Sequence, residues 1–364
     1  MDMREGEKPF FSIVMPVYNC EHYIGRMIDS IRKQTFTDWE LIAVNDCSTD
    51  GSAALIEKVA EEDRRIRLLS MDINRGVSAA RNRGIEEARG NYLWFADADD
   101  RVDPDLLQKV KESLDVNPAK MVIFGLEEEY FDQQGHFQYS HVICHEEKYF
   151  RTKEELRPEM ICLERETMYG YPWNKVYDLE YLRRGEFRFA DYDEAKFIED
   201  IKFNVEYCMD IDSLNILAFC PYHYAKRMEA NLTNEFTRDY FKFHRRRIQM
   251  LFEQYTGWGI CIEEVKEILG SLYARYILSA MQRNCDKRSE MGHAERVRWC
   301  RKLFDDRLFN DLIDVSRAED SRALSVLIAV LRTRNTFLCL SMGRTVYMIQ
   351  KMMPMVYSKI KSGR

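Results

Sequence analysis

Short apolar runs alternate with amphipathic helical stretches through the first 125 residues, and this alternation restricts the fold more than any other feature of the sequence. The run FFSIVMPV at 10–17 is almost continuously apolar, which is typical of a strand buried on both faces. Between Ile24 and Ile31 the apolar residues recur at i, i+3, i+4 and i+7, which predicts a helix with one apolar face. The chain therefore opens with a strand followed by a helix.

The same alternation predicts four more strands and two more helices. Strands that alternate with helices of this length form right-handed βαβ units around a mostly parallel sheet. The predicted fold class is therefore α/β, with helices flanking a central sheet. The strands are expected at 39–46, 66–72, 91–97 and 120–126, and the helices at 52–62 and 77–89, with Gly90 as the C′ residue that ends the second one.

Polar residues follow four of these strands at the point where each strand ends. In parallel sheets, ligands bind beyond the carboxyl ends of the strands. One acid has a separate explanation, because Asp103-Pro104-Asp105 matches an N-cap followed by a proline at the first helical position. The other polar residues indicate a binding site at this edge: Tyr18 and Asn19, Asn45 and Asp46, the segment 72–76, and Asp97, Asp99 and Asp100.

The middle and the end of the chain have a different character. Residues 127–144 predict a hairpin around Gly135, and aromatic residues crowd the segment 168–177. The segment 198–208 predicts the start of a helix, and 213–227 predicts a strand that leads into a loop. Beyond about residue 236 the pattern is helical throughout, without strand-like alternation.

Composition excludes several classes of protein. The 364 residues carry a net charge of -7, which argues against a nucleic-acid binder. The ten cysteines form no CxxC pair, so a reducing cytoplasm is expected and a secreted disulfide framework is not. The N-terminal MDMREGEKPF lacks the apolar core of a signal peptide, and no stretch reaches the roughly 18 uncharged apolar residues of a spanning helix. A soluble or surface-bound protein is expected.

The motifs that are present and absent limit the reactions that the chain can be expected to catalyse. The chain lacks GxGxxG after its first strand, and it lacks GxxxxGK[ST] and GxSxG anywhere. His141, Cys144 and His145 could form a metal cluster, but strand alternation points them apart, so ordinary strand residues are the favoured interpretation. Asp97-Ala98-Asp99 at a strand end suits a hard divalent cation that keeps phosphate oxygens as co-ligands. Such a cation stabilises a departing nucleotide diphosphate.

With these motifs, the first 125 residues resemble an inverting glycosyltransferase of family 2 with the GT-A fold. The resemblance rests on 12–52, SIVMPVYNCEHYIGRMIDSIRKQTFTDWELIAVNDCSTDGS, on 74–100, NRGVSAARNRGIEEARGNYLWFADADD, and more loosely on PWNKVY at 172–177 and IED at 198–200. It implies a GT-A catalytic domain over 1–230, with a nucleotide-binding half at 9–125 and an acceptor half at 126–230. A helical region with a basic amphipathic tail follows at 231–364.

The resemblance also implies a nucleotide-sugar donor, commonly UDP-linked, and a Mg²⁺ or Mn²⁺ ion. Asp46 would accept a hydrogen bond from the base, and Asn45 stands where the family usually carries a second acid. Asp99 would bind the metal, and Asp97 would face the ribose or the sugar. The other residues implied to contact the donor are Pro16, Tyr18 and Asn19 in the nucleotide pocket, Asn74, Gly76 and Arg81 along the diphosphate and sugar, and Arg227 in a loop that closes over the diphosphate.

The family places its catalytic base in a Glu-Asp pair, which here is Glu199-Asp200. Asp200 is the first choice and Glu199 the second. Structural interpretations stay open beside these assignments. In these alternatives the pair merely places acids in the first turn of a helix, Asp46 caps the helix after the second strand, Arg81 is a solvated helix residue, and Gly76 is only a turn residue.

The expected function is the transfer of a single sugar, with inversion, to a hydroxyl of a glycan acceptor in surface polysaccharide biosynthesis. A nucleotidyltransferase is one alternative, and it would typically show a Gly-rich, Lys-containing signature near the N-terminus. A non-catalytic nucleotide-sugar-binding module is the other, and it would be expected to lack the D-x-D or the Glu-Asp pair. Both of these are present.

The tail at 323–364 mixes apolar and basic residues and contains no acid. This composition suits an interfacial helix on an anionic membrane and an enzyme with a lipid-linked acceptor. The alternative is a helix that packs on its own domain or on a second subunit. The expected location is the cytoplasm, with peripheral contact at the cytoplasmic face of the membrane, and an oligomer is left open.

Overall fold

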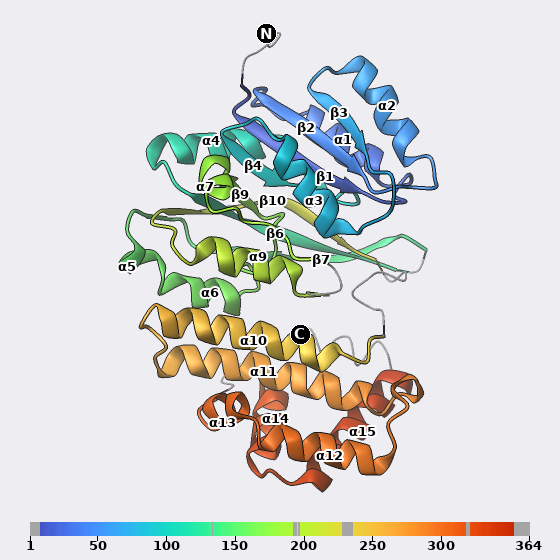
Figure 1. Ribbon diagram of the computed structural model, residues 1–364, viewed down its shortest axis with the longest axis vertical. Helices are drawn as coiled ribbons and strands as arrows, with labels where there is room; N and C mark the ends of the chain where they lie inside the picture. Colours follow the sequence, from blue (N-terminus) through green and yellow to red (C-terminus); the bar gives the residue numbers. More distant parts are fainter. Residues whose placement is uncertain are drawn as a thin grey trace. The chain divides into compact units, whose positions relative to one another are not determined.

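The computed structural model describes residues 8–132, 134–191, 195, 197–227, 236–317 and 321–352. The chain folds as two compact units, Met1–Asn231 and Leu232–Arg364. The first unit contains the sheet and its flanking helices, and the second unit is made of helices (Figure 1).

The first half of the sheet is a parallel array in the order β3-β2-β1-β4. All of these strands, and the helices between them, lie where the sequence predicts them. Every residue of β2 is buried, and α1 buries the apolar face that the sequence predicts. The elements are β1 Phe11–Val17, α1 Ile24–Arg32, β2 Trp39–Asn45, α2 Ser52–Glu62, β3 Ile66–Ser70, α3 Val77–Glu87 and β4 Tyr92–Phe95.

The second half makes the ten-stranded sheet a mixed one. Its order continues from β4 as β9-β6-β10-β5, with β7 on β6 and β8 on β10. Only β6 and β10 are parallel here, and the other pairs are antiparallel, so the predicted parallel pairing is mainly a property of the first four strands. The strands are β5 Arg101–Val102, β6 Met121–Phe131, β7 Phe137–Ile143, β8 Lys148–Phe150, β9 Lys175–Asp178 and β10 Leu214–Lys226, and the helices are α4 Leu106–Val116, α5 Lys153–Leu156, α6 Glu159–Arg165, α7 Leu179–Arg184 and α9 Glu199–Cys208.

Gly90 has a different role from the predicted one. Helix α3 ends at Glu87, and Gly90 has no positive φ, so it is not a left-handed C′ residue. It lies against β1 instead, where a Cβ atom would come within 2.6 Å of the Ser12 backbone nitrogen. The Ser12 hydroxyl accepts hydrogen bonds from the backbone N–H groups of Arg89 and Gly90 and donates one to buried Glu40.

Asp103 also departs from its prediction as a helix cap. Helix α4 begins at Leu106, with Asp105 in the N-cap position and no side-chain cap. The Asp103 carboxylate lies 3.0 Å from Nε2 of His223 on β10 instead. Local sequence favoured capping, but a tertiary contact with a residue 120 positions later determines where this side chain lies.

The second unit is helical, as the sequence predicts for the region beyond 236. Its helices are α10 Tyr240–Gly257, α11 Glu263–Arg283, α12 His293–Phe304, α13 Arg307–Ile313, α14 Arg322–Arg332 and α15 Thr336–Met352. Helix α11 contacts α10, α13, α14 and α15 (Figure 1). In the described ranges, no helix is both long enough and apolar enough to cross a membrane.

The predicted basic tail is partly packed on protein. Helix α14 buries Leu324, Leu327, Ile328 and Leu331, and α15 packs on α11 and α12 through Cys339 and Gly343. Residues 353–364 of the tail lie outside the described residues. One face of α15 stays exposed, and it carries Phe337, Ser341, Arg344, Met348, Lys351 and Met352.

Substituting Gly90 by Ala tests the close approach to β1. The added methyl group would press on backbone atoms, which cannot move aside as a flexible side chain can. We expect Gly90→Ala to lower the free energy of unfolding by about 1–3 kcal/mol in urea denaturation.

Gly25→Ala is the matched control, because a Cβ at this exposed position of α1 meets nothing within 4 Å. Its stability should be unchanged or raised by about 0.5–1 kcal/mol. Equal effects of the two substitutions would contradict the assignment.

Candidate active site

The loops after β1 and β2 are tied together at the carboxyl edge of the parallel strands. Asn19 adopts a left-handed backbone conformation with φ of 48°. Its backbone N–H donates to the Ser48 hydroxyl at 3.1 Å, and its side-chain oxygen accepts from the Thr49 backbone at 2.8 Å. Pro16 lies near the end of β1 and Tyr18 follows it with a side chain that is 53% exposed. This edge therefore presents an accessible aromatic ring beside an ordered pair of loops.

Asp46 orders the loop that leads into α3. Its two carboxylate oxygens accept hydrogen bonds from the backbone N–H groups of Arg75 at 2.8 Å and Gly76 at 2.7 Å. Gly76 has φ of 87°, a conformation that favours glycine, and exposed Asn74 precedes the pair. Asp46 does not cap α2, so that structural alternative is wrong. The carboxylate is buried and joins the ends of β2 and the loop after β3.

Arg81 brings together three segments that are far apart in the sequence. From α3, its guanidinium donates to Asp200 at 2.6 Å through Nη1 and to Asp97 at 3.1 Å through Nη2. The side chain is 4% exposed, so the alternative of a solvated helix residue is wrong. Burial by itself lowers the pKa of Arg81, but the neighbouring carboxylates outweigh it, and the pKa is raised. Arg81 is therefore a buried cation that aligns one acid at the end of β4 and one at the start of α9.

Glu199 and Asp200 lie in different environments although they are adjacent. Burial raises the pKa of Asp200, and Asp97 adds to this, although Arg81 opposes it. Of the two carboxylate oxygens of Asp200, only Oδ1 has a hydrogen-bond partner within the described residues. Glu199 has a buried Oε2 atom without a partner in the described part of the chain, and burial together with Asp200 raises its pKa to about 7. Asp200 is thus aligned by a cation, whereas Glu199 is a poorly solvated acid beside it.

Asp99 is paired with Arg227, which extends beyond the end of β10. The Arg227 guanidinium donates to Asp99 Oδ2 at 2.9 Å and to the Asp99 carbonyl oxygen at 2.7 Å, and it lies 4.0 Å from the centre of the Tyr23 ring. The Asp99 side chain is 47% exposed. Desolvation of the carboxyl group within the turn raises its pKa, Asp97 adds to this, and Arg227 only partly offsets it. At the carboxyl edge of the parallel strands, the partly exposed carboxylate of Asp99 therefore lies beside the guanidinium of Arg227.

Asp100 has a structural role that the sequence does not reveal. It is fully buried, and it accepts hydrogen bonds from the Tyr222 hydroxyl and the Ala225 backbone N–H, each at 2.8 Å. Burial, together with Asp99 and Asp97, raises its pKa well above its ordinary value. Because both partners belong to β10, Asp100 connects the segment 97–100 after β4, called the acidic turn below, to that strand.

The donor set around Asp99 fits a hard divalent cation. Three acids occur within four residues, and carboxylate oxygens are the ligands that Mg²⁺ and similar ions prefer. Within the described residues, the Oδ1 atom of Asp99 has no hydrogen-bond partner, so Arg227 leaves one oxygen of this carboxylate available. Asp100 uses both of its oxygens on β10, whereas Arg81 holds Asp97 through Oδ1 alone. Asp97 and Asp99 can thus each offer one oxygen to a cation, and Asp99 is the more exposed of the two.

An aromatic stack lies beside the acidic turn, and sequence analysis noted its crowding without assigning it. Trp173 stacks between Tyr171 and Tyr222, with ring centres 4.7 and 4.3 Å away. The Tyr222 hydroxyl accepts a hydrogen bond from the Asp97 backbone N–H at 3.3 Å. Buried Lys175 holds the backbone that carries the stack, because its ammonium group donates to the carbonyl oxygens of Met168 and Tyr171. Burial lowers the pKa of Lys175 to about 7.

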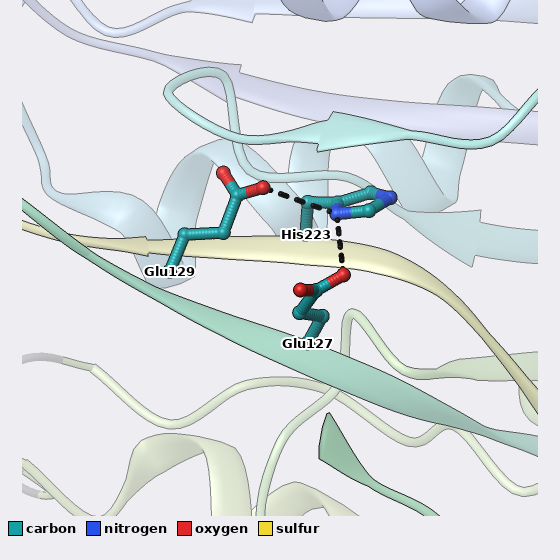
Figure 2. A group of neighbouring side chains, drawn as sticks. All are labelled: Glu127, Glu129 and His223. Atoms are coloured by element: carbon teal, nitrogen blue, oxygen red, sulfur yellow. Dashed lines mark ion pairs between the residues drawn. The ribbon is translucent and has the colours of Figure 1, made fainter. Parts of the chain in front are cut away.

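A second polar cluster was missed by sequence analysis. Glu127 and Glu129 on β6 each lie 3.3 Å from Nδ1 of His223 on β10 (Figure 2). The available signal was the run Glu127-Glu128-Glu129 on a strand, since alternation places its first and third members on one face. In contrast, His145 pairs with Glu159 and Glu166, and it forms no cluster with His141 and Cys144 in the described ranges. His141 lies on β7 as expected, whereas Cys144 and His145 lie in the loop between β7 and β8, so the interpretation as strand residues is wrong for these two.

Replacing Glu199 by Gln tests the environment of the acidic pair. The folded-state pKa of Glu199, about 7, lies above its ordinary value of 4.5, so ionisation of this group weakens the folded state as pH rises through this window. We expect Glu199→Gln to be more stable than the wild type at pH 8, on the order of 1 kcal/mol, and to lose this advantage at pH 5. Urea unfolding at both pH values measures the difference.

The control for this prediction is Glu206→Gln, which removes a partly exposed acid that pairs with Lys202 on the same helix. Its effect on stability should not change between pH 5 and pH 8. A difference between Glu199→Gln and the wild type that is independent of pH would contradict the assigned environment of Glu199.

Comparisons with known proteins agree with this geometry. Residues 12–184 match the sequence model of Glycosyl transferase family 2. The glycosyltransferase EpsJ of Bacillus subtilis (strain 168) is 32% identical over 213 residues, which is 57% of this chain and 59% of EpsJ. The poly(ribitol-phosphate) beta-N-acetylglucosaminyltransferase TarS of Staphylococcus aureus (strain Mu50 / ATCC 700699) is 25% identical over 222 residues, 60% of this chain and 36% of TarS. These alignments span about three fifths or less of the relatives' own lengths.

The fold is shared over a longer stretch. The crystal structure of S. aureus TarS 1-349 in complex with UDP-GlcNAc matches with a TM-score of 0.62 at 19% identity, and the match covers 94% of this chain and 91% of that one. This likeness concerns the fold alone. The matched sequence model over 12–184, the glycosyltransferase relatives and this shared fold together support a family 2 glycosyltransferase, with a GT-A-like α/β fold followed by a helical region.

Proposed function

We propose that this chain transfers a single sugar from a nucleotide-diphosphate sugar, UDP-linked, to a hydroxyl group of a glycan acceptor, with inversion at the anomeric carbon. The observation that carries the proposal is the buried contact of Arg81 with both Asp97 and Asp200. This contact places an acid that can take a proton next to the strand-end carboxylate that the family resemblance assigns to the donor. A binding module would have no need for an aligned acid of raised pKa.

The donor would lie along the carboxyl edge of β1 to β4. Asp46 already accepts two backbone hydrogen bonds, but each carboxylate oxygen has two lone pairs, so it can accept a third from N3–H of uracil. Tyr18 offers an exposed ring for the base, next to Pro16 and Asn19. Gly76 and exposed Asn74, which precede α3, would line the diphosphate. These assignments rest on the family resemblance and on the shared position of the loops.

Asp200 is the proposed general base. Arg81 holds its Oδ1 atom, which orients Oδ2 to accept the proton of the attacking hydroxyl group. Attack from the face opposite the leaving diphosphate inverts the anomeric configuration. Glu199 remains the second candidate for the base. The Arg227 guanidinium beside Asp99 provides positive charge for the departing diphosphate.

Mg²⁺ or Mn²⁺ is the proposed cofactor, and Asp99 would hold it. Bound there together with the diphosphate, the cation would neutralise negative charge on the leaving group. The relevant support is chemical: Asp99 offers an oxygen without a partner among the described residues, within a turn of three acids.

The acceptor is proposed to be a lipid-linked glycan of a surface polysaccharide. Support comes from relatives such as TarS, whose name describes transfer to a ribitol-phosphate polymer. Residues 126–230 would form the acceptor half, where the partly exposed rings of Tyr171 and Tyr224 lie near the acidic turn. A glycan ring can pack on such aromatic faces.

Donor hydrolysis tests the enzyme assignment. In the presence of Mn²⁺, a panel of UDP-, GDP-, CMP- and dTDP-sugars should yield slow release of one nucleotide, expected to be UDP. Asp200→Asn should lower the rate of release about 10²- to 10⁴-fold with donor affinity little changed, because it removes the base and keeps the shape. Asp99→Asn should abolish the dependence on Mn²⁺. NMR of the released sugar should show the inverted anomer.

The control is Asp115→Asn, which changes an exposed acid on α4 and should leave the rate unchanged. Greater loss in Glu199→Gln than in Asp200→Asn would move the base to Glu199. Retained configuration, or the absence of nucleotide binding by calorimetry for every donor, would overturn the proposed function.

We also propose peripheral contact with the cytoplasmic face of the membrane through the exposed face of α15. Phe337, Met348 and Met352 are 74%, 45% and 72% exposed, and Arg344 and Lys351 lie on the same side of the helix. The helix contains no acid. Apolar and basic side chains on one face suit an interface with anionic lipids.

Vesicle flotation tests this contact. Full-length protein should float with phosphatidylglycerol vesicles, and the double substitution Phe337→Ser with Met348→Ser should reduce the bound fraction about fivefold, since it removes two of the exposed apolar side chains of this face. Val326→Ser, at an exposed apolar position of α14, is the control and should bind as the wild type does. Absence of wild-type binding, or equal binding by both variants, would contradict the membrane contact.

A further inference from the structure

The cluster of Glu127, Glu129 and His223 arises from strand register. In the parallel pairing of β6 and β10, His223 lies beside Glu127, and Glu129 lies two residues further along the same face. On the other side of His223, Arg101 of the short strand β5 is its antiparallel partner. The side chains of His223 and Glu129 are each 8% exposed, and that of Glu127 is 27% exposed. The cluster is thus largely buried, with access from the side of Glu127.

One nitrogen of His223 is accounted for and the other is not. Nε2 lies 3.0 Å from a carboxylate oxygen of Asp103, and an ionised carboxylate only accepts, so Nε2 carries a hydrogen. Nδ1 points between the carboxylates of Glu127 and Glu129, as Figure 2 shows, yet it is buried and has no hydrogen bond within the described residues. A neutral imidazole would therefore direct a lone pair at two carboxylates, and all three groups would repel one another.

The distances suit a metal ion at Nδ1. Burial lowers the pKa of His223, but its contacts with Glu129 and Asp103 outweigh this and raise it, so a proton is the competing occupant. Hydrogen bonds from a cationic nitrogen to a carboxylate are about 2.7–2.9 Å long, whereas both oxygens lie 3.3 Å from Nδ1. Two ligands at about 2.0–2.1 Å from a tetrahedral ion are about 3.3–3.4 Å apart. The one-atom ligands of the three residues all lie within 4.8 Å of one another. Small movements of the two glutamates would complete the geometry.

The contacts around His223 resemble those that usually orient a metal-binding histidine. Such a histidine normally donates its second ring N–H to a carboxylate, which sets the tautomer and the ring orientation. Asp103 has this position relative to His223, which also explains why its carboxylate does not cap α4. Arg101 pairs with Glu129 and neutralises one of the negative charges. With Glu129 neutralised by Arg101, the charges of Glu127 and Asp103 remain, and two negative charges favour a dication.

From these contacts we propose that Glu127, Glu129 and His223 bind a divalent transition-metal ion, with zinc as the best fit, at a site separate from Asp99. Imidazole and carboxylate ligands in a tetrahedral arrangement suit Zn²⁺, and water would supply the fourth ligand. The ion would cross-link β6 and β10. Through Asp103 it would also brace the segment that follows the acidic turn at 97–100. Its role is therefore structural support of the active-site edge.

Calorimetric titration of the EDTA-treated full-length protein with Zn²⁺ tests the proposal. The wild type should show one site that Glu127→Gln weakens at least tenfold, because a neutral amide replaces a charged ligand. Glu128→Gln is the matched control, since Glu128 lies on the opposite face of β6 and pairs with Lys226. It should bind Zn²⁺ as the wild type does, and so should Asp99→Asn. Zn²⁺ should raise the melting temperature of the wild type more than that of Glu127→Gln.

Several outcomes would overturn the proposal. They are the absence of Zn²⁺ binding, equal affinity in Glu127→Gln and Glu128→Gln, or loss of the site in Asp99→Asn. The conservative Glu127→Gln keeps the test valid if substitution of the more buried His223 prevents folding. Binding by cysteine thiols would leave Glu127→Gln indistinguishable from the wild type. A ¹⁵N spectrum in which His223 carries both ring protons at pH 7, unchanged by Zn²⁺, would show that a proton holds the cluster together.

Discussion

The buried guanidinium of Arg81 is the interaction on which the arrangement of the site depends. A charged group in the interior is costly unless it is paired and hydrogen-bonded, and Arg81 meets this requirement with Asp97 and Asp200. Removing one member of such a buried pair costs about 3–5 kcal/mol, because the remaining charge is left without compensation. The need to pair Arg81 therefore brings α9 to the end of β4. This is how two acids 103 positions apart come to share one cation.

Strand β10 supports the site from both of its faces. On one face, Tyr222 donates to Asp100 and its ring packs in the aromatic stack with Trp173. On the other face, His223 lies among Asp103, Glu127 and Glu129. Beyond the strand, Arg227 reaches Asp99. One strand of the second half of the sheet thus holds the acidic turn that the first half provides, which couples the proposed donor edge to the rest of the domain.

Acids in this site are distinguished by their partners more than by their residue type. Asp100 is fully buried and held by β10, Asp97 pairs with buried Arg81, and Asp99 pairs with Arg227 and is more exposed than Asp97. Glu199 and Asp200 are adjacent, yet only Asp200 is aligned by a cation. Different environments for neighbouring carboxyl groups are a common way in which enzymes assign different roles to similar groups. The proposed separation of metal ligand, donor contact and base follows this physical logic.

The sequence by itself determined the α/β alternation, the five predicted strands, the edge at which the acids gather and the helical character beyond 236. These features depend on local periodicity and on the geometry of parallel strands, which can be recognised from a single sequence. Only the tertiary structure decided that Asp46 orders the loop before α3, that Gly90 approaches β1, that Asp103 faces His223, and that Glu127 and Glu129 converge on that histidine. Each of these depends on contacts between segments far apart in the sequence. Local propensity cannot anticipate such contacts, because strand order and register determine them.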